Sequence, residues 1–259
     1  MILIFGGTTE GKQVIEVLQK LQLQYIYSTK TKIDVVLDEF GEYRHGAFTY
    51  SSLEAYIIKN KVKLIIHASH PFATELHQTI SLVSVSCNVP VLRLERQFPK
   101  RQVNTAVHYV KGYSEALELI NKNYPNKKLL ALTGVQSIGK LKPYWLNNKT
   151  IFRILDRQIS IDIAVEHKFP KDQLLLGYPN KNITDEIELI NSLIIELVLT
   201  KESGESGTLS LKIDAAKQCN IPIIILEKPS LPSEFIIVKN KLNLSKVLVE
   251  MNLITNQLK

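Results

Sequence analysis

The chain has 259 residues, of which 45% are hydrophobic and 22% are charged, and its formal net charge is +7. These proportions are those of a globular protein and exclude a collagen, a mucin, a disordered chain and a disulfide-rich mini-protein. Two cysteines are too few for a secreted disulfide framework or a cysteine-spaced metal site, and they predict a reducing, cytoplasmic location. No stretch approaches the ~18 apolar residues of a membrane span, and no secretory leader is expected.

The first half of the chain predicts alternating strands and helices. The apolar strand 2–5 leads into a glycine loop, and a helix over 10–21 has apolar residues at helical spacing. The elements expected next are a strand at 24–28, a helix at 51–59, a strand at 64–68, a helix at 74–86, strands at 90–94 and 107–110, and a helix at 113–121. Continuous apolar strands linked by helices indicate a parallel, doubly wound α/β sheet that is buried on both faces.

The second half repeats the plan of the first. Residues 86–96 read SCNVPVLRLER and residues 218–228 read QCNIPIIILEK, at an offset of 132. Three further pairs of blocks keep the same order at offsets of 128 to 132, namely 4–12 with 132–140, 64–69 with 196–201, and 107–112 with 235–240. We therefore expect an internal duplication, with one domain over 1–126 and a second over 127–259. Whether the strand at 107–110 stays in its own half or crosses to the other is left open.

A glycine-rich segment, GGTTEGK at 6–12, stands directly between the first strand and the first helix. Glycines let a phosphate approach the backbone, and the amides at a helix N-terminus bind it. This position favours a dinucleotide loop over a tight turn without a ligand, although the spacing is not G-x-G-x-x-G. The segment and residues 134–140 also nearly match a P-loop. Gln13 and Leu141 replace the hydroxyl residue that holds magnesium, so a P-loop-like ATPase or kinase is the alternative hypothesis.

The residues after the second strand favour a phosphorylated cofactor. An NAD site usually has an acidic residue about 20 residues after the glycine loop. Here residues 28–32 read STKTK, and no acidic residue comes before Asp34. Because hydroxyls and lysines suit a 2′-phosphate, Ser28 and Lys30 predict NADPH, with NADH as the second choice. For any single lysine, a solvated basic loop is the alternative.

Two further loops carry candidate site residues. HASHPFA at 67–73 follows a buried strand, and ligands of open α/β sheets bind beyond the carboxyl ends of the strands. Ser69 and His70 are therefore expected in that crevice, where His70 could donate a proton or hold an anion. TKESGESG at 200–207 is the second-half counterpart and predicts an anion cradle. A helix-capping role for His70 and a solvated loop at 200–207 are the alternatives.

The distribution of charge argues against a nucleic-acid surface. The lysines are scattered without a run of five, and few aromatic residues lie among them. The positive charge therefore indicates acidic small ligands rather than nucleic acid. We expect neither nucleic acid nor a membrane as a partner, and a monomer or weak oligomer. A non-catalytic module that binds nucleic acid or an acidic partner is a third hypothesis.

Taken together, GGTTEGK, HASHPFA, VPVLRLER and TKESGESG resemble the precorrin-6A reductase family, which includes the cobalt-precorrin-6A reductases, from Met1 to about Pro229. The resemblance implies two Rossmann-like domains with parallel sheets and a cleft between them. It implies NAD(P)H-dependent reduction of a double bond in the macrocycle of precorrin-6A, or of its cobalt form, to precorrin-6B in cobalamin (vitamin B12) biosynthesis. The substrate of this family is a polycarboxylated tetrapyrrole, which suits a basic protein.

The motifs that carry the resemblance also indicate roles for single residues. His70 is the candidate catalytic residue, and no metal ligand is expected. Cofactor binding is expected of the glycine loop together with the end of the second strand: Gly6, Gly7, Thr8, Thr9, Glu10, Gly11, Ser28 and Lys30. Substrate binding is expected of Ser69, Pro71, Arg93, Arg96, Lys201, Ser203 and Gly204.

Overall fold

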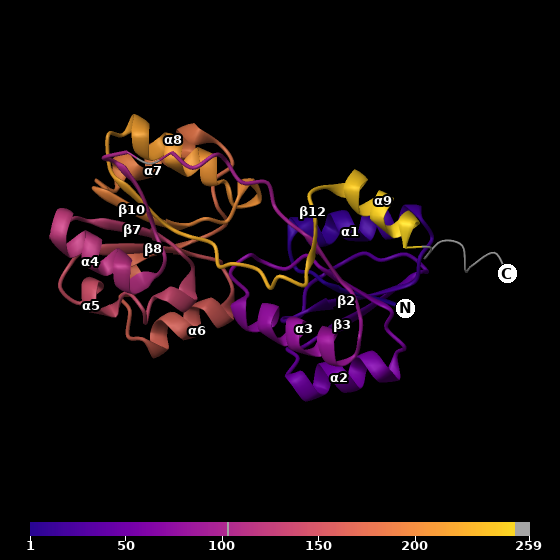
Figure 1. Ribbon diagram of the computed structural model, residues 1–259. Coiled ribbons are helices and arrows are strands. Elements are labelled where there is room, and N and C mark those ends of the chain that lie inside the picture. The colour runs from indigo at the N-terminus through magenta and orange to yellow at the C-terminus, as the bar shows by residue number, and fades with distance from the viewer. Residues whose placement is uncertain (103, 252–259) are drawn as a thin grey trace. The chain divides into compact units, whose positions relative to one another are not determined.

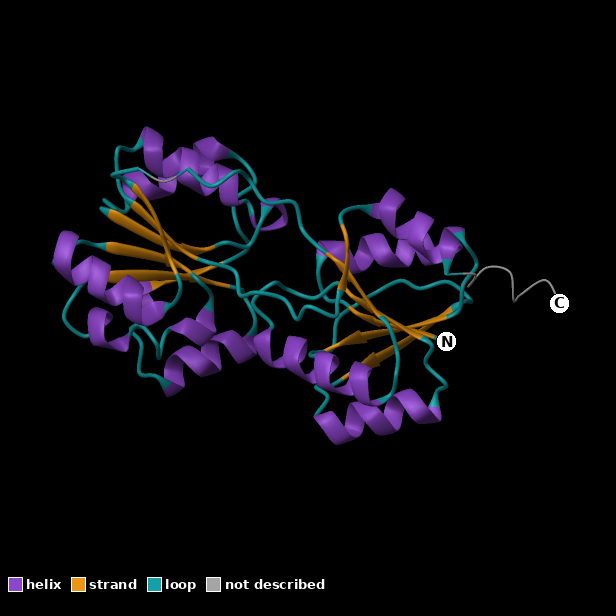
Figure 2. Cartoon of the chain, in the orientation of Figure 1, coloured by secondary structure: helices purple, strands orange, loops and turns teal. Residues whose placement is uncertain are grey.

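The computed structural model describes residues 1–102 and 104–251. The chain divides into two compact units. Met1–Gln97 and the segment that starts at Pro229 form unit 1, and Phe98–Lys228 forms unit 2. Each unit is a six-stranded sheet with helices on both faces (Figures 1 and 2). The predicted α/β class with two parallel-sheet domains is therefore confirmed.

Unit 1 has the strand order of a Rossmann fold. Its strands are β1 (Ile2–Phe5), β2 (Tyr25–Thr29), β3 (Gly41–His45), β4 (Leu64–His67), β5 (Val91–Leu94) and β12 (Ile236–Val238). Its helices are α1 (Thr9–Lys20), α2 (Tyr50–Lys59), α3 (Thr74–Ser86) and α9 (Lys241–Glu250). The sheet runs β12-β5-β4-β1-β2-β3 with every pair parallel, which places the change of winding direction next to β1.

Unit 2 repeats this order as β6-β11-β10-β7-β8-β9, again entirely parallel. Its strands are β6 (Val107–Val110), β7 (Leu129–Leu132), β8 (Thr150–Ile154), β9 (Leu174–Leu176), β10 (Leu197–Lys201) and β11 (Ile223–Leu226). Its helices are α4 (Tyr113–Asn123), α5 (Lys142–Trp145), α6 (Gln158–Glu166), α7 (Ile183–Ser192) and α8 (Leu209–Gln218). Short 3₁₀ turns lie at Val135–Ser137, Lys171–Gln173 and Glu205–Gly207.

The last strand of each sheet comes from the other half of the sequence. β12 pairs with β5, and β6 pairs with β11. In Figure 1 the yellow helix α9 therefore lies beside the indigo helix α1. The compact units differ from the expected division at residue 126, because the chain passes from one unit to the other after Gln97 and again after Lys228. The strand left open by the sequence thus crosses into unit 2.

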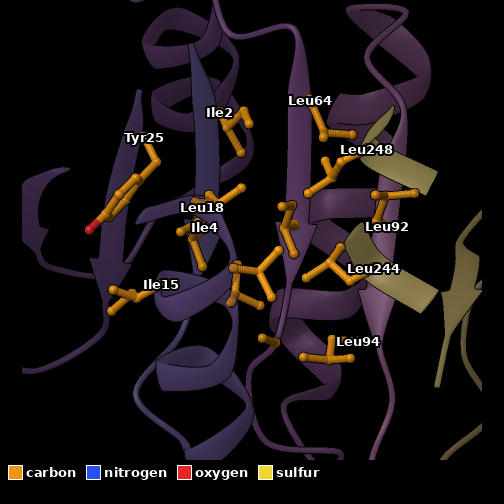
Figure 3. Packing of buried hydrophobic residues seen from close by; sticks show 14 of the residues in the cluster. Ile2, Ile4, Ile15, Leu18, Tyr25, Leu64, Leu92, Leu94, Leu244 and Leu248 are labelled. Carbon is orange, nitrogen blue, oxygen red and sulfur yellow. The ribbon is translucent and has the colours of Figure 1, made fainter. Parts of the chain in front are cut away.

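Alternate residues of each strand pack on opposite faces of the unit 1 sheet. Ile2 and Ile4 pack with α1 and α9, whereas Leu3 and Phe5 pack with α2 and α3. Figure 3 shows the first of these clusters, in which Leu244 and Leu248 of α9 reach side chains of the sheet. Burying one such side chain contributes about 1.5–3 kcal/mol. Burial on both faces explains the continuous apolar strands and leaves the carboxyl edge of the sheet for ligands.

Two elements differ from the sequence-based expectation. β3 was not predicted, because this edge strand is only half-buried and lacks an apolar run. After Gly134 the chain forms a 3₁₀ turn and the four-residue α5, not the long helix that follows the first glycine loop. In the described residues, no helix combines the length and the apolar character that a membrane span requires.

Candidate active site

The glycine loop turns tightly against the ring of Tyr27. The amide of Gly6 donates to the carbonyl of Ser28 at 3.0 Å, and the amide of Gly7 donates to Tyr27 Oη at 2.8 Å. A β-carbon on Gly6 would overlap the Tyr27 ring, and one on Gly11 would press against Tyr27 Oη. Gly7 has a φ of +85°, a backbone conformation that favours glycine, and little surrounds it. Packing therefore requires Gly6 and Gly11, and backbone conformation requires Gly7.

Thr8 caps α1 and ties the loop to β4. Its Oγ1 donates to the carbonyl of Ala68 at 2.5 Å and accepts from the amide of Gly11 at 3.1 Å, so this hydroxyl has no proton left for a ligand. In the described part of the chain, the amides of Thr8 and Thr9 donate to no other group, and Thr9 is exposed. These two amides, at the positive end of a twelve-residue helix, are the donors that an anion could use.

Glu10 pairs with Arg96 inside unit 1. Arg96 Nε donates to Glu10 Oε2 at 3.0 Å, and only 6% and 5% of the two side chains are exposed. Burial lowers the pKa of Arg96, and the Glu10 carboxylate opposes that shift. The pair joins the first turn of α1 to the residues after β5. Sequence reasoning placed Glu10 at the cofactor and Arg96 at the substrate, and the structure brings these two side chains together.

Ser28 lies at the carboxyl end of β2, beside an arginine that the sequence analysis missed. Arg44 Nη1 donates to Ser28 Oγ at 2.7 Å, and the Arg44 guanidinium lies 3.8 Å from the centre of the Phe48 ring. Lys30 is exposed two residues after Ser28. Arg44 belongs to β3, and an arginine in a strand without an apolar run gives little signal. Arg44 therefore contacts the Ser28 hydroxyl, and the exposed Lys30 follows two residues later in the chain.

The turn after β4 holds His70 in a defined orientation. The amide of Phe72 donates to His70 Nδ1 at 3.1 Å, which assigns the proton of the neutral ring to Nε2. Ser69 is 7% exposed, and its Oγ lies 3.3 Å from His67 Nδ1. Pro71 is buried and precedes α3 by three residues rather than starting it. Of the three predicted site residues in this turn, Ser69 and Pro71 are buried and His70 is half-buried.

Arg93 is completely buried, with no exposed surface. Its Nη1 donates to the carbonyl of Ser69 at 2.8 Å, and its Nη2 lies 3.4 Å from Glu95 Oε1. Sequence reasoning placed this guanidinium at the substrate, whereas the structure turns it into the layer between the sheet and α3. The reason is the register of β5, which puts Arg93 beside His67 of β4 and on the same face of the sheet.

Unit 2 presents hydroxyls and lysines at the carboxyl ends of its strands. Thr133 Oγ1 and Ser137 Oγ lie 2.6 Å apart at the end of β7, around Gly134. Gly134 has a φ of +81°, and a β-carbon there would meet nothing within 4 Å. The Nζ of the exposed Lys140 lies 5.0 Å from the centre of the Tyr113 ring. The two hydroxyls are buried and bonded within the turn, so Gly134 and the exposed Lys140 are the parts of it that face a ligand.

Lys201 ends β10 and is half-buried. Burial lowers the pKa of its ammonium to about 8, and the neighbouring Lys140 adds to that shift. Ser203 and Gly204 are buried, and Gly204 has a φ of +72°, so these two residues shape the turn after Lys201. Two lysines that repel each other at the carboxyl edge of a sheet are suited to a carboxylate ligand.

Glu202 binds residues near both ends of unit 2, where the chain enters this unit and where it leaves it. Sequence reasoning missed this role. Arg101 donates from Nε and Nη2 to the two carboxylate oxygens of Glu202, each at 2.8 Å. The amide of Lys228 donates to the same carboxylate at 2.9 Å, and Arg101 also pairs with Glu227 at 3.4 Å. The residue next to Lys201 therefore anchors the chain where it enters and leaves unit 2.

A separate pocket of about 430 Å³ lies along β9 and α7 of unit 2. Its arginine, Arg153, donates to both carboxylate oxygens of Glu186, at 2.7 and 3.2 Å. No predicted site residue lines it, so it is not the candidate site. No group of three or more His, Cys, Asp or Glu side chains among the described residues is arranged to hold a metal.

Comparison with known proteins identifies the family. The family model "Precorrin-6x reductase CbiJ/CobK" matches residues 1–248. The chain belongs to this family. The resemblance read from the four motifs is therefore confirmed, and the match spans both units.

Named relatives of this family member share about a quarter of its residues. It is 27% identical over 243 residues to a cobalt-precorrin-6A reductase of Methanococcus maripaludis, with 89% of this chain and 92% of the relative covered. It is 25% identical over 235 residues to a precorrin-6A reductase of Rhodococcus erythropolis, with coverage of 89% and 90%. The solved structure of a CobK precorrin-6A reductase superposes with a TM-score of 0.77, covers 96% of each chain at 20% identity, and supports the fold.

Proposed function

We propose that this chain is a precorrin-6A reductase of cobalamin biosynthesis. It would reduce one double bond of the macrocycle of precorrin-6A, or of its cobalt form, with a nicotinamide cofactor. The observation that carries the proposal is the family match over residues 1–248, together with named reductases that align over about nine-tenths of both chains. Relatives of both the cobalt and the cobalt-free type match, so the two substrates are to be tested side by side.

The residues of the unit 1 loop fit the diphosphate of a dinucleotide. Gly7 is exposed, with only the Thr29 methyl near a β-carbon placed there, and the amides of Thr8 and Thr9 at the start of α1 have no partner in the described residues. The loop follows β1, where the strand order reverses, which is the usual dinucleotide position in such sheets. When bound, the cofactor supplies the hydride, so the protein needs no nucleophile of its own.

We assign the cofactor preference to the carboxyl ends of β2 and β3. Arg44 donates to Ser28 Oγ at 2.7 Å, and the exposed Lys30 follows the end of β2. Such a group binds a 2′-phosphate better than a free ribose hydroxyl, which an acidic residue would bind instead. NADPH is therefore the proposed cofactor, and NADH the weaker one.

Each unit, taken by itself, offers groups that we assign to the substrate. We assign to His70, whose neutral ring carries its proton on Nε2, the role of holding or donating the proton that accompanies the hydride. Lys201 and Lys140 would bind carboxylates of the tetrapyrrole. The buried residues Arg93, Arg96, Ser203 and Gly204 would support these groups from within, together with Ser69 and Pro71.

The ATPase alternative has no support in the structure. Gln13 follows Lys12 and Leu141 follows Lys140, so neither loop has the hydroxyl residue that holds magnesium in a P-loop. The loop after Gly134 also leads into a 3₁₀ turn instead of a phosphate-binding helix. For location we propose the cytoplasm, since Cys87 and Cys219 are both free thiols.

Anaerobic turnover tests the proposed function. Purified protein is mixed with precorrin-6A or cobalt-precorrin-6A and with NADPH or NADH, and cofactor oxidation and product mass are followed. We expect oxidation that depends on the tetrapyrrole, faster with NADPH, and a product heavier by two hydrogens. No oxidation of either cofactor with either substrate, together with magnesium-dependent ATP hydrolysis, would refute the assignment.

A further inference from the structure

Three buried polar side chains of unit 1 form a cluster that the proposed function does not use. His67 of β4 lies beside Arg93 of β5 in the sheet register, and His77 of α3 packs edge-on against His67 with ring centres 4.9 Å apart. The exposed fractions of the three residues are 0%, 0% and 2%. Around them the layer is apolar, and Phe235 packs against the His67 ring at 5.7 Å. This group is called the histidine–arginine cluster below.

The cluster is poorly satisfied for a buried polar group. In the described part of the chain, His67 Nε2 and Arg93 Nε have no hydrogen-bond partner. Buried polar atoms without partners are costly, and native cores contain few of them. A core selected for stability alone would not hold such a group at this position.

The strands of unit 2 provide an internal comparison. Thr200 of β10 pairs with Ile225 of β11 as His67 of β4 pairs with Arg93 of β5. Both unit 2 residues are completely buried. The duplicated sheet is thus built at the same place without an imidazole or a guanidinium.

The helices repeat this contrast. α3 and α8 end at Cys87 and Cys219, so that His77 and Leu209 each lie ten residues before the capping cysteine. Leu209 is 1% exposed and belongs to the apolar core of unit 2. Unit 2 thus forms the same fold with a threonine, an isoleucine and a leucine at these places, so the fold does not require the histidine–arginine cluster.

Two members of the cluster contact the same turn residue, Ser69, while the second Nη of Arg93 lies 3.4 Å from Glu95 Oε1. Arg93 Nη1 donates to the Ser69 carbonyl at 2.8 Å, and His67 Nδ1 lies 3.3 Å from Ser69 Oγ. Ser69 directly precedes His70, whose ring and carbonyl accept the amides of Phe72 and Ala73. The backbone and the hydroxyl of one turn residue are thus both held from the buried side.

Electrostatics keep a single positive charge in the cluster. Burial lowers the pKa of His67 well below its usual range, and Arg93 and His77 add to this shift. Burial and Arg93 lower the pKa of His77 to about 4, while the backbone of His70 and the Glu95 carboxylate oppose the shift. Both imidazoles are therefore neutral near pH 7, and neither competes with the guanidinium for the Ser69 carbonyl.

We propose that Arg93 and His67 are positioning residues that hold Ser69, and through it His70, in the orientation needed for reduction. Neither side chain touches substrate. The inference rests on the proposed function for its kinetic consequence, but its structural consequence can be measured without substrate. If it is correct, loosening either contact frees the turn at 69–73 while the sheet remains intact.

Amide hydrogen exchange of the full chain tests the structural consequence. In Arg93→Met, we expect the amides of Phe72 and Ala73 to exchange about tenfold faster or more, since a hydrogen bond to a charged group is worth that factor. In His67→Leu, which removes the contact of a neutral ring, we expect a smaller increase of about threefold. Exchange in the centres of β1 and β4 should not change. Unchanged exchange at 72 and 73, or faster exchange throughout unit 1, would overturn the inference.

Kinetics test the same contacts with conservative pairs. Arg93→Met should lower kcat about tenfold with little change in the KM of NADPH, and Arg93→Lys should lose less because it keeps the charge. In His67→Asn the side-chain amide can take the position of His67 Nδ1, whereas in His67→Gln it reaches the position of Nε2. Relative to His67→Leu, we expect a higher kcat in His67→Asn but not in His67→Gln. Equal kcat in these two variants would contradict a role for the His67–Ser69 contact.

Arg153→Met is the matched control, because Arg153 is a nearly buried arginine paired with Glu186 in unit 2. It should lower the melting temperature but leave kcat per folded molecule unchanged. A similar kcat loss in Arg153→Met would show that the Arg93 effect is one of general stability and would overturn the inference. If the wild-type chain reduces no tetrapyrrole while exchange changes at 72 and 73 alone, the proposed function fails and the positioning role stands.

Discussion

At the scale of single residues, packing and ligand binding make different demands on the glycine loop. Gly6 and Gly11 are required because the Tyr27 ring leaves no room for a β-carbon. The Thr8 hydroxyl is used by Ala68 and Gly11. A change at any of these positions would damage unit 1 along with the ligand site. The exposed Thr9 is the loop residue at which binding can be altered without altering the fold.

Thr9→Glu should therefore weaken NADPH binding and leave the protein at least as stable. A carboxylate in the first turn interacts favourably with the helix dipole, by about 0.3–1 kcal/mol, but it repels a diphosphate at the same amides. Titration of NADPH fluorescence should show a dissociation constant about tenfold higher or more, with no fall in melting temperature. Thr184→Glu, at the exposed start of α7, is the control and should bind NADPH normally. Equal binding by both variants would place the diphosphate elsewhere.

Lys201 makes a second prediction at this scale. Because its pKa is lowered to about 8, the side chain loses its positive charge as the pH rises through that value. Binding of a polycarboxylated porphyrin, used as a probe, should therefore weaken between pH 7 and 9. Lys201→Arg should remove this dependence because arginine stays charged, and Lys201→Met should bind weakly at every pH. A pH-independent affinity of the wild-type chain would contradict a carboxylate contact at Lys201.

At the scale of elements, the packing of β4 against α3 determines how unit 1 responds to acid. His67 and His77 are buried and neutral in the folded protein, and both have a depressed pKa. In the unfolded chain they titrate at their usual value of 6.5. Below that pH the unfolded state binds more protons than the folded state, so stability falls as the pH falls.

Chemical denaturation between pH 7 and 4 should show this loss directly. Each depressed histidine contributes a slope of at most about 1.4 kcal/mol per pH unit over the window from 6.5 to about 4, and the full contribution is present above pH 6.5. His77→Leu should reduce the slope of the unfolding free energy against pH by the contribution of one histidine. The exposed His45, replaced by Gln, is the control and should leave it unchanged. A free energy of unfolding that is flat across this window in the wild-type chain would argue against buried neutral imidazoles.

At the scale of the whole molecule, the exchange of β6 and β12 determines which fragments can fold. Residues 98–228 contain all six strands of the unit 2 sheet, whereas residues 127–259 lack β6 and carry β12, which belongs to the other sheet. Val107 and Val110 of β6 are nearly completely buried. Loss of β6 would therefore expose both a hydrophobic surface and an unpaired edge of β11.

We expect the fragment 98–228 to unfold cooperatively and the fragment 127–259, of similar length, to remain largely unfolded or to aggregate. Thermal unfolding and amide NMR spectra of the two fragments measure this. Adding β6 back, as the fragment 98–259, is the control and should restore a cooperative transition for unit 2. Cooperative folding of 127–259 alone would show that β6 is dispensable for this sheet.

The family, the parallel α/β class and the duplication follow from local sequence alone, because apolar runs, glycine turns and their order are properties of neighbouring residues. The same holds for the place of the glycine loop and of the turn with His70. Tertiary structure decided what depends on partners distant in the sequence. The two sheets have similar edges at β5 and β11, and the residues of β6 and β12 do not by themselves indicate which edge each strand joins. Likewise, the register of β5 turned Arg93 inward, and folding brought Arg96 to Glu10, because burial and pairing of charges are set by long-range packing.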